Sequence, residues 1–211
     1  MAQTTSATLL TALTARGEMR GTLAFASVLF ISVLTATAAQ VSVPLPFTQV
    51  PFTLQPMVVL LGGMALGSRL GCASQVLYLM AGIAGLPVFA ASATLPPGPL
   101  RLLGPTAGYL LAYPLAAFVT GYLAERGFDR KYLRATIAML AGLVVVYACG
   151  VIWLAFFART LTTSAAVGLS AAVMTGAYPF ILPDLVKVFA AAGIVPSIWR
   201  LIGQTPARGR A

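Results

Sequence analysis

The stretch ATIAMLAGLVVVYACGVIWLAFFA, residues Ala135–Ala158, contains no charged side chain. A helix of this length rises about 1.5 Å per residue and is long enough to cross a hydrocarbon core about 30 Å thick. The whole chain of 211 residues is 59% hydrophobic and 8% charged, whereas soluble domains carry roughly a quarter charged residues. A single soluble domain of this size could not bury so much apolar surface. The sequence therefore predicts an all-α integral membrane protein.

Similar apolar runs, separated by charged or proline-rich stretches, predict the remaining membrane spans. The expected spans are 21–43, 53–67, 71–90, 104–124, 135–158 and 183–203. Residues 1–20 and the basic residues 204–211 are expected to form tails on the cytoplasmic side. The segment 160–178 is apolar enough to resemble a span, but we expect it to remain at the outer side as an interfacial or re-entrant segment.

The positive charges decide between six and seven crossings. The chain has 13 Lys and Arg against 4 Asp and Glu, and its net charge is +9. These basic residues lie between and beyond the apolar runs, so they indicate membrane topology and contact with lipid, and nucleic acid is excluded as a partner. Lys and Arg accumulate in cytoplasmic loops. A seventh crossing would move Arg200, Arg208 and Arg210 outside, whereas six crossings leave only Arg101 and Arg159 there. The sequence thus predicts a compact six-helix bundle in the inner (plasma) membrane with both termini cytoplasmic.

Several classes of site lack the residues they need. The chain has two cysteines and no histidine, so neither a disulfide framework nor a metal site is indicated. No GxxxxGK[ST] run is present to hold nucleotide phosphates. With few residues available for general acid–base work, we expect the chain to be neither an enzyme nor the holder of a cofactor.

One acid and one base interrupt the last span. Asp184 and Lys187 are three residues apart, so they lie on one face of a helix, about 4.5 Å apart along its axis. Pro183 suits a first helical turn, which would put Asp184 near the positive end of the helix dipole. Ionisable groups within a span usually face a partner or a cavity. The pair is therefore either a structural ion pair or the polar anchor of a ligand site that opens outward.

Other polar side chains are expected at the same outer side of the bundle. Each alone is weak evidence for a site, because a lone Thr or Gln in a span more often bonds to a neighbouring helix. These residues are Gln40, Gln49, Thr53, Gln55, Ser92, Thr94, Thr106 and Tyr109.

Four short pieces of sequence occur in an order that resembles a known family. They are PLPFTQVPFTLQP (44–56), GIAGLPVFA (82–90), GPTAGYLLAYPLAAF (104–118) and PFILPDLVK (179–187). Together they resemble the biotin-transporter family (BioY), the substrate-binding S-components of energy-coupling factor (ECF) transporters. The resemblance extends from about Gly21 to about Arg200. It implies a six-helix bundle with cytoplasmic termini that captures biotin near the outer face and moves it inward.

The resemblance also implies a set of ligand-binding residues. The family's acid and lysine on the sixth helix correspond to Asp184 and Lys187. Asp184 can accept a hydrogen bond from a ureido N–H, and Lys187 can meet either the ureido carbonyl or the carboxylate of biotin. The family's glycine-rich loop is replaced here by a segment in which Ser92 or Thr94 could substitute. The remaining expected binding residues are Gln55, Tyr109 packing against the rings, and Arg101, which faces either the ligand carboxylate or lipid headgroups.

The resemblance further implies partner chains. An ECF transmembrane coupling subunit and separate ATPase subunits would supply the energy for uptake. The nearest match to the family's small-residue docking pattern pairs Ala24 with Val28 and Ser32 with Ala36, and it is imperfect. Two alternatives stay open, namely an S-component for another vitamin and a proton- or ion-coupled secondary transporter with Asp184 as the relay.

Overall fold

The computed structural model describes residues 8–9, 20–92, 95–96, 98–157 and 168–203, and this part of the chain is mostly helical. Its α-helices are α2 (Arg20–Gln40), α3 (Gln55–Leu66), α4 (Ser68–Ile83), α5 (Ala107–Ala124), α6 (Tyr132–Phe156), α7 (Leu169–Gly176), α8 (Tyr178–Ala192) and α9 (Ile194–Gly203). The short elements are the 3-10 helices η1 (Pro99–Leu103) and η2 (Phe128–Arg130) and the strands β1 (Ser42–Val43) and β2 (Phe52–Thr53), which pair antiparallel.

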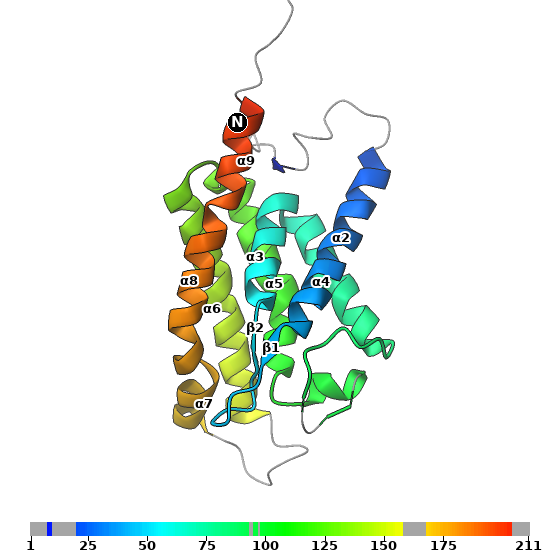
Figure 1. Cartoon of the computed structure of the whole chain (residues 1–211), viewed down its shortest axis with the longest axis vertical. Helices are drawn as coiled ribbons and strands as arrows, with labels where there is room; N and C mark the ends of the chain where they lie inside the picture. The colour runs from blue at the N-terminus through cyan, green and yellow to red at the C-terminus, as the bar shows by residue number, and fades with distance from the viewer. Residues whose placement is uncertain (1–7, 10–19, 93–94, 97, 158–167, 204–211) are drawn as a thin grey trace, which may run out of the picture.

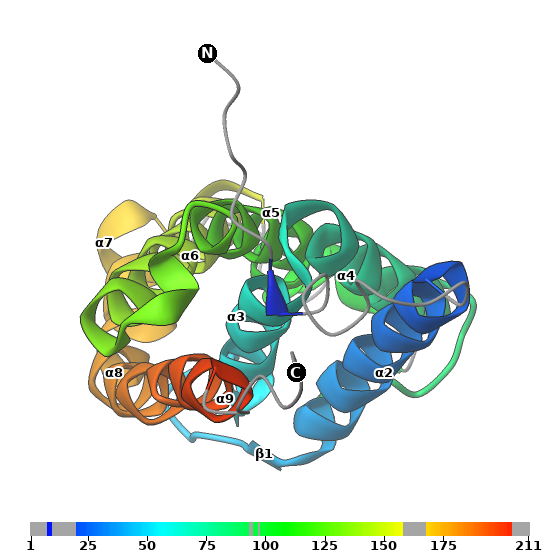
Figure 2. The same cartoon turned by 90° about the horizontal axis from the view of Figure 1, so that it is seen from above.

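The long helices lie side by side and give the molecule two distinct ends (Figure 1). At one end α2 begins and α9 ends, close to η2 and the turn between α3 and α4. We call this the basic end, because Arg126, Arg130, Lys131 and Arg134 are exposed there. The paired strands and α7 lie at the other end, which we call the pocket end. Seen along the bundle, α3 is surrounded by the other helices (Figure 2), and it contacts α2, α4, α5, α6 and α8.

Length and apolar composition identify helices that could cross a bilayer. In the described part of the chain there are four, at Gly21–Gln40, Ala107–Ala124, Tyr132–Phe156 and Tyr178–Leu201. The helix α3 is apolar but shorter. At 12 residues it extends for about 18 Å, less than the hydrocarbon thickness of about 30 Å. The third expected span also differs in its bounds, because α4 begins at Ser68 and ends at Ile83 rather than at residue 90.

The expected start of the last span at Pro183 is wrong. The helix α8 already begins at Tyr178, and Pro179 takes the first-turn position that needs no N–H donor. Pro183 lies inside the helix, where a missing N–H is tolerated more readily than in soluble helices. Asp184 is therefore an interior helical residue and not a neighbour of the helix N-terminus. The last span also consists of two helices, because α8 ends at Ala192 and α9 begins at Ile194.

Glycines bring three helices into backbone contact near the turn between α3 and α4. A Cβ added to Gly63 of α3 would lie 2.9 Å from Cα of Ala117 in α5. A Cβ on Gly71 of α4 would lie 2.8 Å from Cα of Gly63. Separations this short are essentially never adopted by real Cβ atoms. The glycines thus allow α3, α4 and α5 to pack closely against one another.

Two expected segments fall partly outside the described residues. Of the segment 160–178, the described part begins at Gly168 and contains α7, which packs against α6 and α8 at the pocket end. Of the expected N-terminal tail, Thr8 and Leu9 are described and are buried, and Leu9 belongs to the main hydrophobic core. The remainder of both segments, and the tail 204–211, lie outside the described residues.

Candidate functional site

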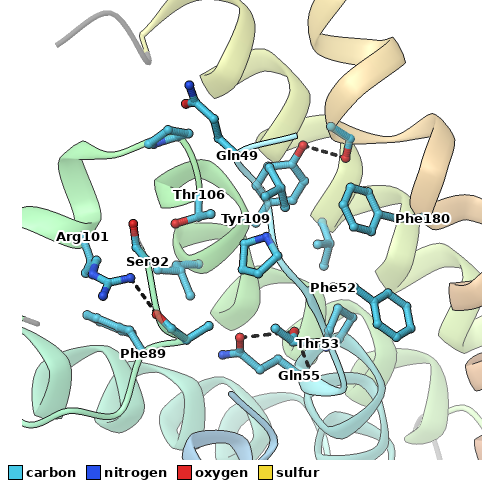
Figure 3. Close-up of a pocket in the computed structure, with 18 of the residues that line it drawn as sticks. Gln49, Phe52, Thr53, Gln55, Phe89, Ser92, Arg101, Thr106, Tyr109 and Phe180 are labelled. Atoms are coloured by element: carbon cyan, nitrogen blue, oxygen red, sulfur yellow. Dashed lines mark hydrogen bonds between the residues drawn. The ribbon is translucent and has the colours of Figure 1, made fainter. Parts of the chain in front are cut away.

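A pocket opens at the pocket end of the bundle (Figure 3). It encloses about 870 Å³ of empty space, including the part that is open to solvent. The pocket is formed by the β2 strand and the start of α3, the loop before η1, and facing parts of α5, α6 and α8. Polar side chains lining it are Gln49, Thr53, Gln55, Ser92, Arg101, Thr106, Tyr109, Tyr113, Tyr147, Asp184 and Lys187.

Asp184 and Lys187 form an ion pair inside this pocket. The Lys187 Nζ donates to Asp184 Oδ1 at 2.7 Å and to the backbone carbonyl of Thr53 at 2.6 Å. It also lies 3.6 Å from the centroid of the Phe52 ring. Both residues are largely buried, with exposed fractions of 5% for Asp184 and 9% for Lys187. The prediction that the two side chains share one helix face is confirmed.

The second oxygen of Asp184 is held by a residue that the sequence analysis missed. Tyr147, in α6, donates its hydroxyl to Asp184 Oδ2 at 2.6 Å. A signal was present in the sequence, because Tyr147 lies in the middle of an apolar span. A tyrosine hydroxyl in that position needs a hydrogen-bond partner, and the only acid placed within a span was Asp184. The carboxylate is thus fixed by donors from two helices.

Arg101 belongs to a different wall of the pocket. Figure 3 shows Arg101 and Phe180 on opposite sides, and Asp184 follows Phe180 by four residues, hence on the same face of α8. The Arg101 guanidinium donates to the backbone carbonyls of Ala90, at 2.6 Å, and Pro96, at 2.9 Å. Its exposed fraction is 7%, and burial lowers its pKa below the ordinary value. The alternative of a headgroup-facing arginine is therefore wrong.

Gln55 lies on the pocket wall within a chain of hydrogen bonds. Its Nε2 donates to the Tyr78 hydroxyl at 2.7 Å, and its Oε1 accepts from Thr53 Oγ1 at 3.3 Å. Tyr78 in turn donates to the backbone carbonyl of Val88 at 3.3 Å. These bonds connect the start of α3 with α4 and the loop that follows it. Gln55 consequently has a structural task here, whether or not it also contacts a ligand.

The other expected residues have different positions. Tyr109 lines the pocket with its ring, while its hydroxyl donates to the Gly176 carbonyl at 2.9 Å. Ser92 lines the rim and accepts a bond from the backbone N–H of Leu95 at 3.3 Å. Thr94 lies outside the described residues. Gln40 is exposed and bonds to the Pro87 carbonyl at 3.2 Å, so it does not join the polar lining.

The rest of the lining is apolar and aromatic. Its members come from four parts of the chain and include Phe52, Phe89, Leu110, Val146 and Phe180. Such walls suit a ring system with apolar faces, while the acid–lysine pair and the arginine offer acceptors and donors at separate places. Among the described residues no group of His, Cys, Asp and Glu side chains could hold a metal ion.

Comparison with protein families gives this geometry a context. The model of the BioY family matches residues 5–204. The chain belongs to the BioY family.

Curated relatives in the BioY family agree over most of their length. The probable biotin transporter BioY of Pyrococcus horikoshii is 41% identical over 84% of this chain and 94% of its own. The biotin transporter BioY of Thermotoga maritima is 36% identical over 80% of this chain and 90% of its own. The biotin transporter BioY of Rhodobacter capsulatus is 40% identical over 76% and 84%.

A solved structure shares the fold of this BioY family member. It is the crystal structure of the S-component for biotin from an ECF-type ABC transporter. The two structures superpose with a TM-score of 0.75 over 87% of this chain and 94% of the other, at 23% sequence identity. The likeness extends across the whole bundle and therefore supports the helix arrangement described above.

Proposed function

We propose that this chain is the biotin-binding subunit of a biotin uptake transporter. The observation that carries the proposal is the pocket itself, in which apolar and aromatic walls separate the Asp184–Lys187 pair from Arg101. Biotin has matching parts, because its fused rings are largely apolar while its ureido group and its carboxylate are polar ends. The naming of the curated relatives as biotin transporters supports the same ligand.

The geometry favours one orientation of biotin in the pocket. Asp184 accepts from one ureido N–H, and Lys187 donates to the ureido carbonyl beside it. Arg101 meets the carboxylate on the opposite wall. A guanidinium has five N–H donors, and the bonds to the Ala90 and Pro96 carbonyls use two of them. Tyr109, Ser92 and Gln55 complete the lining around the ligand.

We further propose six membrane crossings with both termini in the cytoplasm and the pocket facing outward. The four long apolar helices, together with α3 and α4, support this count. Exposed Arg126, Arg130, Lys131 and Arg134 at the basic end support its cytoplasmic placement by the positive-inside rule. The membrane is then the cell inner (plasma) membrane, and the segment 160–178 remains on the outer side.

Energy for uptake comes from other chains in this proposal. The sequence has no phosphate-binding GxxxxGK[ST] run, so the subunit is not itself an ATPase. An ECF transmembrane coupling subunit and ATPase subunits would move the loaded subunit inward. Relatedness to an S-component by fold supports this division of labour.

The proposal is tested by calorimetric titration of the purified chain with biotin, thiamine and riboflavin. Biotin alone is expected to bind tightly, and tight binding of another vitamin in its place would contradict the proposal. The Arg101→Gln variant tests the orientation. Its Kd for biotin is expected to rise about tenfold, the scale of one charge-assisted hydrogen bond, while its Kd for biotin amide changes little. An equal loss for both ligands would reject the contact between Arg101 and the carboxylate.

A further inference from the structure

The carboxylate of Asp184 is fixed by one donor on each oxygen. Lys187 Nζ bonds to Oδ1 at 2.7 Å, and the Tyr147 hydroxyl bonds to Oδ2 at 2.6 Å. Lys187 is on the same helix as Asp184, whereas Tyr147 belongs to α6. Tyr147 is thus the contact that ties the orientation of this carboxylate to a second element of the pocket wall.

An aspartate does not set the plane of its own carboxylate. Its last torsion is broad and roughly two-fold, so neighbouring donors must decide where the acceptor lone pairs point. An ionised carboxylate has about four such lone-pair sites. Lys187 and Tyr147 each occupy one, on different oxygens, and one site per oxygen is left. In a pocket lined by all three side chains, Asp184 can then present a free lone pair in a fixed direction to a donor of a ligand.

Tyr109, which also lines the pocket, differs from Tyr147 in the acceptor of its hydroxyl. Tyr109 donates to a backbone carbonyl, that of Gly176, and so connects α5 with the end of α7. Tyr147 donates to Asp184, the one acidic side chain among the described residues that line the pocket. A hydrogen bond to a charged acceptor is shorter and stronger than one between neutral groups. The Tyr147 bond is therefore suited to hold the acceptor in one orientation.

We propose that Tyr147 is a positioning residue, which orients the Asp184 carboxylate so that it accepts from a ureido N–H of the ligand while Lys187 donates to the adjacent ureido carbonyl. This inference rests on the proposed function and deepens it, because it assigns part of the selection for a ureido ring to a tyrosine. Without the hydroxyl, Asp184 keeps its charge and its bond to Lys187, but its free lone pairs no longer have a fixed direction. Recognition of the ureido N–H that faces Asp184 then weakens more than binding of the rest of the ligand.

The test compares Tyr147→Phe with Tyr132→Phe in the full chain. Tyr132 is a matched control, because its hydroxyl also connects α6 to α8, by a bond of 3.0 Å to the Phe189 carbonyl at the basic end of the bundle. Kd is measured by calorimetry for biotin and for one of its two ureido N-methyl derivatives, the one that wild-type protein binds more weakly. In Tyr147→Phe, Kd for biotin is expected to rise about tenfold, and the penalty for methylation is expected to shrink. Tyr132→Phe should leave both values as in the wild type.

The outcomes separate this inference from the proposed function. If wild-type protein does not bind biotin, the proposed function fails and the inference fails with it. If wild-type protein binds biotin and Tyr147→Phe weakens both ligands by the same factor, or neither, Tyr147 is not a positioning residue and the proposed function stands. Should Tyr147→Phe not fold, Tyr147→3-fluorotyrosine keeps the ring and strengthens the donor. It is expected to retain wild-type affinity and the full methylation penalty, and loss of either would overturn the inference.

Discussion

Two buried aspartates, one at each end of the bundle, each have an aromatic hydrogen-bond donor and a cation as partners. At the pocket end, Asp184 accepts from the Tyr147 hydroxyl and from Lys187, whose ammonium lies 3.6 Å from the Phe52 ring centroid. At the basic end, Asp129 accepts from the Trp199 indole at 2.6 Å and pairs with Arg130 at 3.3 Å. The Arg130 guanidinium in turn lies 3.5 Å from the Trp199 ring centroid.

The difference between the two clusters lies in the space beside them. Asp184 and Lys187 line the pocket, whereas Asp129 is fully buried and is not part of that lining. The Asp129 cluster connects α9 to η2 and is therefore explained by packing alone. A buried acid with a cation and an aromatic donor is thus insufficient evidence for a ligand site. An adjoining cavity with further polar groups is what distinguishes the two.

The same substitution at both acids should give the largest contrast. Asp184→Asn is expected to raise Kd for biotin by more than about tenfold. The substitution replaces one carboxylate oxygen, which can accept from a ureido N–H, with an NH₂ donor. It also leaves Lys187 without its charged partner. Asp129→Asn should leave Kd unchanged. Calorimetric titration of both variants checks this expectation. Wild-type affinity in folded Asp184→Asn would remove the functional difference between the two clusters.

The two tryptophans of the chain offer a contrast of intermediate size in stability. Trp199 donates to a carboxylate, whereas Trp153 donates to the neutral Gly104 carbonyl at 2.9 Å. Trp199→Phe is expected to lower the free energy of unfolding by about 1–2 kcal/mol and to do so more than Trp153→Phe, because hydrogen bonds to charged groups contribute more. Denaturant unfolding, followed by the helical signal in far-UV circular dichroism, measures the free energy of unfolding of both variants. Equal losses would contradict a special role for the Asp129 bond.

The smallest expected effect is a pH dependence that belongs to Asp129. Burial raises the pKa of this carboxyl above its ordinary value of 3.8. The folded state therefore binds the proton on Asp129 more tightly than the unfolded state does. The stability that protonated Asp129 contributes is complete below the ordinary pKa and is lost as the pH rises through the raised pKa of the folded state. The Tm of the wild type, measured by thermal unfolding, should then fall with rising pH relative to the Tm of Asp129→Asn. A difference between the two proteins that stays constant with pH would rule out the linkage.

The sequence was sufficient for the features that depend on local spacing or on long apolar runs. The helical architecture followed from runs such as Ala135–Ala158, of which residues 135–156 belong to α6. The shared face of Asp184 and Lys187 followed from their spacing of three, and the ion pair confirms it. That the pair binds a ligand, with Arg101, Tyr109, Ser92, Thr94 and Gln55, is still a prediction.

Features that depend on contacts between segments distant in the sequence could not be predicted from local spacing. Tyr147 and Asp184 are 37 positions apart, and no periodicity connects them. The bond from Lys187 to Thr53 spans 134 positions. Pro183 was misjudged for a local reason, since Pro179 offered a second proline that could begin the helix and the sequence contained no rule for choosing between them. The burial of Arg101 likewise depends on where η1 folds back against the pocket.

The glycines between α3, α4 and α5 have a consequence for how this sequence can change. At Gly63 and Gly71 any other residue would bring a Cβ within 3 Å of the backbone of a neighbouring helix, and a backbone cannot move aside as a flexible side chain can. Pocket residues such as Phe180 have open space beside them and can be exchanged when a different ligand is to be bound. If the codons for both regions were randomised under selection for uptake, positions 63 and 71 would return almost uniformly to glycine. The ligand specificity of the chain is therefore free to evolve over a frame whose own codons are nearly fixed.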